Sequence, residues 1–575
     1  MQKMTKRYFV ARIMLALTLC WLTATSAAQN VSGRITCEGK GIAGVTVSDG
    51  YVVTQTDENG NYNINSGKKN GYVFYTLPRG YEPQVKDGFN PMFWARLNTD
   101  VSAKEQHDFS LNKVDNDRYS LVISADYHLA NRNNDDAQFK ATFLKRMQEL
   151  KAASHYPVYN TILGDLSWDV YWYANNYNLK DFVNTMKTCK FPLITFPVIG
   201  NHDNNPGTPE GPDTDFEASM PWRTIMCPNY YSYNLGKIHY VVLDNIIYQN
   251  KKGKGPYKKG VVGERNYKCE ITGEQLEWLK KDLAFVDTNT TVVVEFHSPT
   301  WVLDKNTFET KGKNKSAKEL SDIMKPYKRV HYVSGHTHYM QNMHPKEYPN
   351  ITEHNIAAVC AMWWWTGKLS EISVCSDGTP GGYSLWNVNG DSITWKYMSN
   401  EDNNGIQMAV YDINAVKEYY SGEATLQEFL SKNDKRDDFK NWSENSILIN
   451  VFAYDTDWKV DMLSICFLCV SVPKSKLLAV KRMPACEDPM PAIAHDLPRY
   501  KNNKNFARND GSSKNNHMFF AQCTTSDKPV TVKVTDSFGN IYTKKVARPA
   551  AFGLSMDREQ IQKTKISKRY KKVLR

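Results

Sequence analysis

Five short apolar runs, rich in valine, isoleucine and aromatic side chains, constrain the fold of this chain more than any other feature. They cover residues 119–125, 158–163, 191–199, 290–296 and 330–334. One helical pattern lies between each pair of neighbouring runs, over 135–152, 179–188, 272–285 and 316–325. Apolar strands that alternate with helices predict a parallel sheet whose connecting loops gather at its carboxyl edge. The central part of the chain is therefore expected to be α/β.

Side chains of the kinds that bind metal ions follow these runs directly. The residues are Asp126, His128, Asp165, Asn201, His202, Asp203, His297, His336 and His338. Such sheets bind ligands at the carboxyl edge, so residues far apart in sequence are expected to meet there. Carboxylate, imidazole and amide groups, with no thiolate near the motifs, suit Mn, Fe or Zn ions. The pattern predicts a two-metal hydrolase, because two such ions generate hydroxide at neutral pH and offset the charge of a phosphate ester.

The motifs that contain these residues resemble those of the calcineurin-like metallophosphoesterase family. They are DYH at 126–128, GD at 164–165, GNHD at 200–203, FHSP at 296–299 and GHTH at 335–338. The resemblance implies an α/β fold with a metallophosphoesterase β-sandwich core covered by helices. The segment 41–62 and the later stretches DGTPGGY and DSFGN are similar to the terminal β domains of exported bacterial members. An N-terminal β-sandwich and a C-terminal β-rich domain are therefore expected to flank the core.

The resemblance also implies which side chains hold the two metal ions. Asp126, His128 and His338 would bind the first ion, Asn201, His297 and His336 the second, and Asp165 both. A hydroxide that bridges the two ions would attack the phosphorus atom in line. His202 would contact the phosphate and protonate the leaving oxygen, with Asp203 orienting its imidazole. The alternative role for Asp203 is to cap the start of a helix.

Departures from related patterns narrow the expected subfamily. Purple acid phosphatases have a tyrosine three residues after the shared aspartate, where this chain has Trp168. Protein serine/threonine phosphatases carry GDxVDRG and GNHE, whereas this chain has GDLSWD and GNHD. The remaining pattern is more similar to phosphodiesterases and nucleotide-type members, and it leaves both monoesters and diesters open as substrates.

Residues 1–28 are predicted to be a secretory signal peptide. They have a basic start, an apolar stretch over 13–22 and small residues before a cleavage point near Ala28. The protein is therefore expected to be exported to the periplasm or secreted. No later segment has the length and hydrophobicity that predict a membrane span.

The rest of the chain is divided by pattern into four segments. An N-terminal β-sandwich is expected over 29–113, the catalytic domain over 114–350 and a C-terminal β-rich domain over 351–550, where the helical pattern largely stops. A basic tail follows at 551–575, and the part from 556 carries +6 of the +11 formal charge. We interpret the tail as a solvated terminus, with contact to a membrane, a nucleic acid or an acidic glycan as the alternative.

Several other residues have a structural and a functional interpretation. Trp301, Trp363, Trp364 and Trp365 would line a substrate cleft or pack at a domain interface. His239 and His331 lie inside strand-like runs and are interpreted as core or edge residues. Cys466 and Cys469 form a single CxxC, which indicates buried or disulfide-bonded cysteines more than a zinc site.

Two classes of function fit these observations. The first is an exported phosphoesterase that acts on a small-molecule or cell-envelope phosphate ester, with no nucleic-acid partner and an oligomeric state that the sequence does not determine. The second is a glycan- or envelope-binding protein whose β domains bind and whose metal core is not catalytic. A chain that had lost its activity would be expected to lack a ligand or the acid, and this chain retains all of them. Catalysis is therefore the favoured interpretation.

Overall fold

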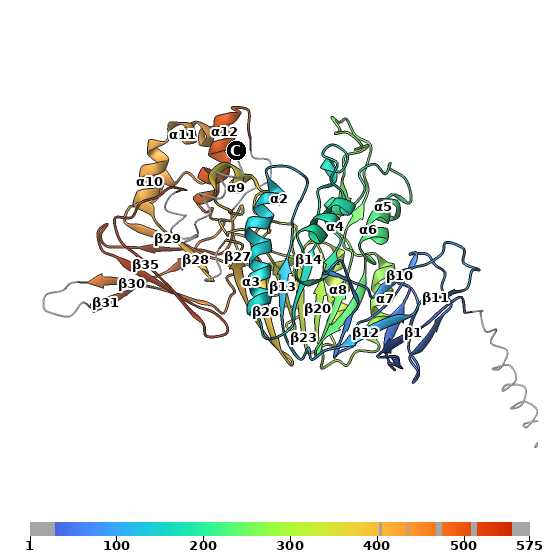
Figure 1. The fold of residues 1–575 in the computed structure, drawn as a ribbon. Helices are drawn as coiled ribbons and strands as arrows, with labels where there is room; N and C mark the ends of the chain where they lie inside the picture. The colour runs from blue at the N-terminus through green and yellow to red at the C-terminus, as the bar shows by residue number, and fades with distance from the viewer. Residues whose placement is uncertain (1–28, 402–404, 434–435, 467–473, 508–513, 555–575) are drawn as a thin grey trace, which may run out of the picture.

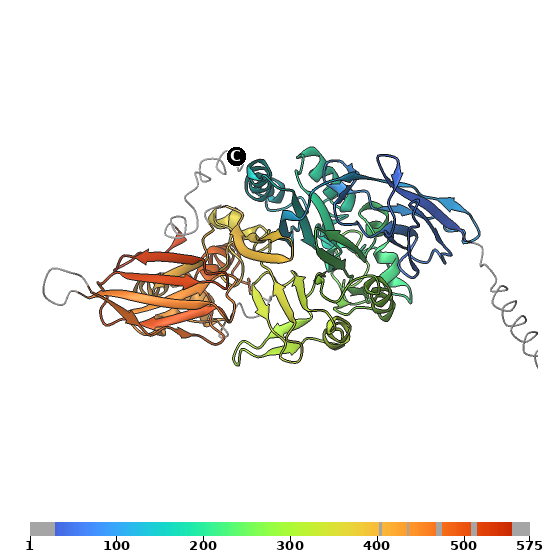
Figure 2. The ribbon, with the colours of Figure 1, turned by 90° about the horizontal axis from the view of Figure 1, so that it is seen from below.

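The structure is a computed structural model that describes residues 29–401, 405–433, 436–466, 474–507 and 514–554. Three units follow one another along an elongated molecule, with the first strands at one end and the last strands at the other (Figures 1 and 2). The expected signal peptide and residues 555–575 of the expected tail lie outside the described residues. Within the described ranges, no helix has both the length and the apolar character needed to cross a membrane.

The N-terminal unit is a sandwich of two sheets. One sheet contains β11 (Glu105–Gln106), β1 (Val31–Cys37), β12 (Phe109–Lys113) and β7 (Tyr81–Pro83), with β2 (Lys40–Gly41) and β5 (Asn61–Ile64) also paired to β1. The other contains β10 (Trp94–Arg96), β6 (Tyr72–Tyr75), β3 (Thr46–Ser48) and β4 (Val53–Gln55). Buried hydrogen bonds join the sandwich to the central unit: Tyr72 Oη donates to Asn229 Oδ1 at 3.0 Å, and Trp278 Nε1 donates to Ser48 Oγ at 3.1 Å.

The central unit is built on two larger sheets. The first has the order β15 (Ile194–Val198), β14 (Val158–Leu163), β13 (Arg118–Ser124), β26 (Gly382–Asn389) and β27 (Ser392–Ser399). The second has the order β16 (Tyr231–Leu235), β17 (Ile238–Val242), β20 (Thr291–Glu295), β23 (Arg329–Ser334), β25 (Ile351–Asn355) and β24 (Gln341–Met343). Parallel pairing joins β15, β14 and β13 in the first sheet, and β17, β20, β23 and β25 in the second.

All five predicted strands form, but they are shared between the two sheets rather than joined in one. Tyr119 of β13 and Tyr240 of β17 meet through their hydroxyl groups at 2.6 Å, which shows that the sheets face each other across a buried layer. The predicted fold class, with its β-sandwich core, is confirmed. The interpretation as one sheet is wrong, because an apolar run shows that a strand is buried but not which sheet it joins.

Helices cover the central sheets close to their predicted positions. The run at 135–152 forms α2 (Asp135–Phe139), a π-helical turn (Lys140–Leu144) and α3 (Lys145–Ala153). The others are α4 (Leu179–Thr188), α7 (Gly273–Leu283) and α8 (Lys315–Met324). Figure 1 shows α2 and α3 beside β13 and β26, and the rings of Phe143 and Tyr383 meet there with centroids 5.6 Å apart. The helices pack against the faces of the sheets, and the connecting loops lie at the carboxyl ends of the strands.

The segment after 350 contributes to the central unit and contains further helices. Strands β26 and β27 pair within the first central sheet, so this sheet extends to Ser399. Helices also continue in this segment, as α9 (Trp365–Ser370), α10 (Ile413–Gly422), α11 (Ala424–Ser431) and α12 (Leu497–Asn502). These helices are short, and α10 and α11 are interrupted at Glu423, so neither is long enough to show a clear helical period in the sequence.

The C-terminal unit contains two further four-stranded sheets. One has the order β28 (Met408–Asp412), β29 (Ser446–Val451), β33 (Met518–Gln522) and β32 (Lys481–Arg482). The other has the order β31 (Lys474–Leu478), β30 (Lys459–Cys466), β34 (Val530–Thr535) and β35 (Ile541–Val546). Cys469 of the CxxC pair lies outside the described residues. The cysteines whose side chains are described are free thiols, at 37, 189, 227, 269, 360, 375, 486 and 523.

Candidate metal centre

The loops that follow five central strands bring all seven predicted metal ligands into one buried cluster. Asp126 and His128 follow β13, Asp165 follows β14, Asn201 follows β15, His297 follows β20, and His336 and His338 follow β23. Both sheets contribute, because their parallel strands end at the same side of the sandwich. Residues 210 positions apart in sequence, such as His128 and His338, lie in contact there.

The cluster has two halves that share one carboxylate. In the first half, Nε2 of His338 lies 3.5 Å from Asp126 Oδ1 and 3.1 Å from Nε2 of His128. In the second half, Nε2 of His297 lies 3.0 Å from Asn201 Oδ1 and 3.1 Å from Nδ1 of His336. Oδ2 of Asp165 lies 3.5 Å from His128 Nε2 and 3.3 Å from His297 Nε2. One oxygen atom therefore stands between the two halves.

The donor atoms fit a pair of metal ions. Oδ1 of Asp126 is buried and has no hydrogen-bond partner among the described residues, although it faces two imidazoles. Imidazole nitrogens meet each other at 3.1 Å in both halves, so the lone pairs of two rings converge on one point where a cation can bind. Oxygen and imidazole donors of this kind bind Mn, Fe or Zn.

Burial and neighbouring charges set the protonation of the cluster. Burial raises the pKa of the Asp165 carboxyl group, but the imidazoles of His297 and His202 outweigh burial and hold this pKa well below its ordinary value. Asp165 is therefore an anion. Burial also lowers the pKa of His128 well below its ordinary value, so this imidazole is neutral and has a lone pair available for a metal ion.

The backbone of the cluster is strained. Five of the seven predicted ligands have positive φ: Asp126 (57°), His128 (45°), Asp165 (55°), His336 (70°) and His338 (55°). Each such non-glycine residue costs about 1–3 kcal/mol, and residues of this kind collect at functional sites. Hydrogen bonds between the loops offset the strain. The amide of His128 donates to the Asp165 carbonyl at 2.9 Å, and the amide of His336 donates to Asp126 Oδ2 at 2.9 Å.

Three family models match the chain in the order of its units. The model for the N terminal of calcineurin-like phosphoesterase matches residues 29–114, the calcineurin-like phosphoesterase model matches 119–340, and the model for its C terminal matches 353–542. The chain belongs to the calcineurin-like phosphoesterase family. It is a metal-dependent phosphoesterase, and the middle model spans every strand-end motif of the cluster.

Solved structures of two phosphatases are also similar to this phosphoesterase. A dimetal phosphatase from Danio rerio is 12% identical with a TM-score of 0.31, and the match covers 49% of this chain and 96% of that one. A purple acid phosphatase from yellow lupin (Lupinus luteus) seeds is 13% identical with a TM-score of 0.33, and the match covers 63% of this chain and 72% of that one. No curated protein matches the phosphoesterase at a significant level.

His202 lies beside the cluster, but a residue other than the expected one orients it. Its Nδ1 lies 2.7 Å from Asp169 Oδ1, and Nη1 of Arg265 donates to the same oxygen at 2.7 Å. The carboxylate of Asp203 instead accepts from the amides of Leu166, Ser167 and Gly200, at 3.0, 3.1 and 3.0 Å. The expectation that Asp203 orients His202 is therefore wrong. Asp203 has the structural role of bracing two loops.

The signal for Asp169 was present in the sequence. It is the final residue of GDLSWD, four positions after Asp165. A 3₁₀ turn (Asp169–Tyr171) directs it toward the loop that follows β15, and it is fully buried. Sequence order alone favours Asp203, the immediate neighbour of His202, but adjacent residues in a tight turn point in different directions.

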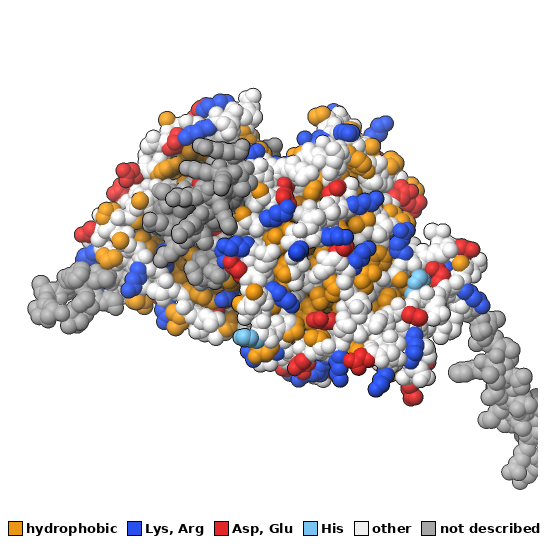
Figure 3. Space-filling view, viewed as in Figure 1, with side chains coloured by type: hydrophobic (Ala, Val, Ile, Leu, Met, Phe, Trp, Pro, Cys, Tyr) orange, Lys and Arg blue, Asp and Glu red, His pale blue; other side chains and the backbone are white. Residues whose placement is uncertain are grey.

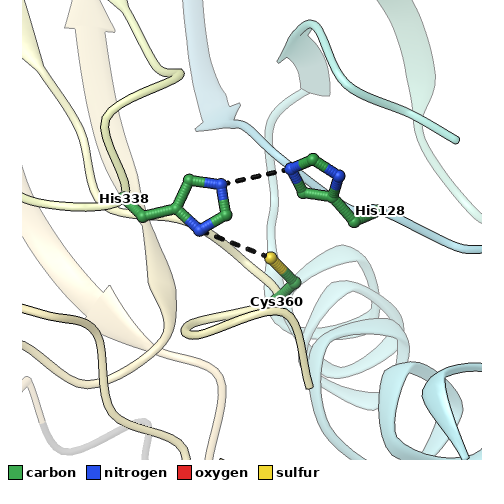
Figure 4. A group of neighbouring side chains, drawn as sticks. All are labelled: His128, His338 and Cys360. Atoms are coloured by element: carbon green, nitrogen blue, oxygen red, sulfur yellow. Dashed lines mark hydrogen bonds between the residues drawn. The ribbon is translucent and has the colours of Figure 1, made fainter. Parts of the chain in front are cut away.

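A thiol also lies near the cluster, contrary to expectation. Sγ of Cys360 is 3.8 Å from Nδ1 of His338 (Figure 4). The same Nδ1 lies 2.7 Å from the carbonyl oxygen of Ala361. Figure 4 shows Cys360 beside one ring nitrogen of His338 while the other faces His128. The backbone carbonyl accepts a hydrogen bond from Nδ1–H, which leaves Nε2 free for a metal ion.

The four tryptophans considered above have different environments. The ring centroid of Trp363 is 4.6 Å from that of His338, so this residue borders the cluster. Trp364 is buried and donates from Nε1 to the Tyr127 carbonyl at 2.8 Å. Trp365 is half-buried, and Trp301 is buried against Tyr348. Only Trp363 of these four borders the cluster in the described structure.

His239 and His331 were expected in the core or at an edge, and the structure places both in the core, on interior strands, with 2% and 6% of their surface exposed.

Gly335 tests whether the tight packing of the loops is needed for metal binding. A Cβ atom at this position would lie 2.5 Å from Ala125 Cβ and 2.8 Å from Asp126 Oδ2. We expect Gly335→Ala to weaken metal binding about 10–100-fold by displacing Asp126, measured as metal content after dialysis against graded chelator. Gly273→Ala is the control, since its Cβ would meet nothing within 4 Å. Equal metal retention in both variants would contradict this account of the packing.

Proposed function

We propose that this phosphoesterase is an exported enzyme that hydrolyses a phosphate monoester or diester with two metal ions, and that His202 protonates the leaving oxygen. The proposal names Asp126, His128 and His338 for one ion and Asn201, His297 and His336 for the other, with Asp165 shared. The ions fit Mn, Fe or Zn by donor type.

The position of Asp165 is the observation that carries the proposal. Its Oδ2 lies within 3.5 Å of an imidazole nitrogen from each half of the cluster. Its Oδ1 accepts a hydrogen bond from the amide of His202 at 2.8 Å, so the same side chain also positions the expected acid. A single carboxylate with these contacts can hold two ions at the spacing that phosphate ester hydrolysis requires.

Two metal ions, when bound, supply hydroxide at neutral pH and offset the charge on the phosphoryl oxygens. The protein's own contribution to the leaving group comes from His202. Its side chain is 20% exposed, whereas the seven predicted ligands are mostly buried, so it can reach a substrate. Because Asp169 holds Nδ1, the remaining ring nitrogen, Nε2, is the atom that donates a proton to the leaving oxygen.

Arg265 and Tyr248 keep Asp169 in place. Arg265 donates to Oδ1 at 2.7 Å, and the hydroxyl of Tyr248 donates to Oδ2 at 3.4 Å. The carboxylate is therefore bound on both oxygens before substrate arrives. This preorganisation reduces the cost of orienting His202 during the reaction.

Export is part of the proposal and rests on the composition of residues 1–28. We expect the protein expressed in a bacterial host to be recovered outside the cytoplasm with its mature amino terminus near Gln29, as read by mass spectrometry. A full-length cytoplasmic product would contradict export without affecting the catalytic proposal.

The reaction class is tested with the chain from Gln29 onward, added Mn²⁺ and an EDTA control. Hydrolysis of p-nitrophenyl phosphate and bis-p-nitrophenyl phosphate distinguishes a monoesterase from a diesterase. We expect Asp165→Asn to lose most of its metal and activity, because one side chain serves both ions. Asp322→Asn, on the exposed face of α8, is the matched control and should retain both. Activity that survives EDTA or Asp165→Asn would refute the proposal.

The role of His202 is tested separately from metal binding. We expect His202→Ala to retain both ions and to slow turnover about 10²–10⁴-fold, the range for loss of a general acid. Asp169→Asn should also retain the ions and should slow turnover about 10–100-fold. Loss of metal from His202→Ala would make this residue a ligand instead. Unchanged turnover in Asp169→Asn would show that its contact with His202 has no catalytic importance.

A further inference from the structure

A group of aromatic side chains leads away from the metal cluster. We call Trp363, Trp168 and Tyr171 the aromatic wall. The ring of Trp168 is 5.1 Å from that of His128 and 6.1 Å from that of Trp363, to which it is nearly parallel at 28°. Tyr171 continues the wall at 5.3 Å from Trp168. All three residues are partly exposed, so a bound molecule can touch them.

Arg132 lies on this wall. Its guanidinium carbon is 4.5 Å from the ring centroid of Trp168, 4.9 Å from that of Tyr171 and 5.3 Å from that of Trp365. These stacking contacts hold the guanidinium plane but satisfy none of its N–H groups. The side chain therefore has a defined position, and none of its N–H groups donates a hydrogen bond to a described residue.

The guanidinium has no acidic partner in the described part of the chain. Its Nη1 atom is buried and makes no hydrogen bond to a described residue. The carboxylate of Asp135 is near enough to interact with the guanidinium charge electrostatically. Its oxygens, however, accept hydrogen bonds from the backbone amides of Ala130, Arg132 and Asp136 rather than from the guanidinium. Burying part of a cation without a counterion costs free energy, and an anionic ligand would offset that cost.

A second donor beside Arg132 is also unpartnered. Nε1 of Trp168 is buried and has no hydrogen-bond partner among the described residues. Trp168 is the same side chain that contacts both His128 and the Arg132 guanidinium. Two donors without acceptors, adjacent to a predicted phosphate site, point to a ligand that carries acceptor oxygens away from the scissile bond.

A segment that borders the wall is rich in cationic residues. Residues 251–268 contain seven lysines and arginines but only Glu264 as an acid. Lys258 lies over the Tyr171 ring at 4.8 Å, and the Tyr267 ring is 5.9 Å from that of His336, so this segment borders both the wall and the metal cluster. Figure 3 shows lysine and arginine side chains along the upper edge of the molecule. A field of this sign favours substrates with more than one negative charge.

Resting on the proposed function, we propose that the substrate is an organic phosphate ester with a ring and a second anionic group. The scissile phosphate lies at the metal cluster, the ring lies against Trp168 and Trp363, and the second anion binds the Arg132 guanidinium. A planar, stacked guanidinium suits a carboxylate or phosphate, because it can donate two parallel hydrogen bonds.

Binding of two phosphonates to the full metal-loaded chain tests the proposal. Phenylphosphonate and 4-phosphonobenzoate differ only by a carboxylate on the ring, and their carbon–phosphorus bond resists hydrolysis. We expect calorimetry to show that 4-phosphonobenzoate binds about 10–100-fold more tightly, the range for one charge-assisted contact. Arg132→Gln should bring this ratio close to one and leave the affinity for phenylphosphonate nearly unchanged.

Arg118→Gln is the matched control. The Arg118 guanidinium also stacks on a ring, that of Tyr156 at 4.1 Å, but it lies at the opposite end of β13 from the cluster. This variant should keep the full preference for 4-phosphonobenzoate. Arg132→Lys retains the positive charge but not the planar guanidinium, so it should keep part of the preference for 4-phosphonobenzoate. This variant replaces Arg132→Gln in the test if the glutamine variant does not fold.

Three results would overturn the proposal: equal affinities in the native protein, a preference that persists in Arg132→Gln, or an equal loss in Arg118→Gln. The first result needs no variant. Hydrolysis of p-nitrophenyl phosphate distinguishes this failure from failure of the proposed function. Metal-dependent hydrolysis together with equal phosphonate affinities would leave the reaction class intact and remove only the subsite.

Discussion

The shared carboxylate of Asp165 is the interaction on which the rest of the central unit depends. It is 2% exposed, is anionic, and contacts imidazoles from both halves of the cluster. Burying a charge is costly unless opposite charges and hydrogen bonds compensate it. The two sheets, the strand-end loops and the amide of His202 together provide that compensation.

The strained loops need support from outside the two central sheets, and the chain after residue 350 provides it. The carbonyl of Ala361 fixes the ring of His338, and Trp364 Nε1 donates to the Tyr127 carbonyl. Asp377 accepts from the amide of Met340 at 2.9 Å and lies 3.2 Å from Nε2 of His517 in the C-terminal unit. The C-terminal unit is thus connected to the GHTH loop through buried polar contacts. It is part of the framework of the site rather than an appended module.

The predicted metal ligands and the residues proposed to bind the rest of the substrate lie on different parts of the fold. The predicted ligands come directly after parallel strands, and all of these strands except the edge strand β15, before Asn201, pair on both sides. The aromatic wall and Arg132 lie on the connecting loops and on the segment before α9, which carries Trp363. Reaction class and substrate preference can therefore be encoded by different parts of the chain.

Much of this architecture was predictable from local pattern. Apolar runs of the right length become strands with bounds close to those expected, and α4 matches its predicted range. The polar residues after each run were identifiable as one cluster because parallel strands end together. What could not be predicted from pattern was the partner of each element: β26 and β27 join the first central sheet, although their alternation resembles that of a separate β domain.

The sequence by itself determined the strands, their polar ends and hence the class of chemistry, because these depend on residue type and short-range order. Only the tertiary structure decided that Asp169 rather than Asp203 holds His202, that Cys360 lies beside His338, and that Arg132 stacks on Trp168. These contacts depend on the direction of side chains in tight turns and on loops that are distant in sequence. Local preference carries little information about either, because both are set by how the two sheets pack.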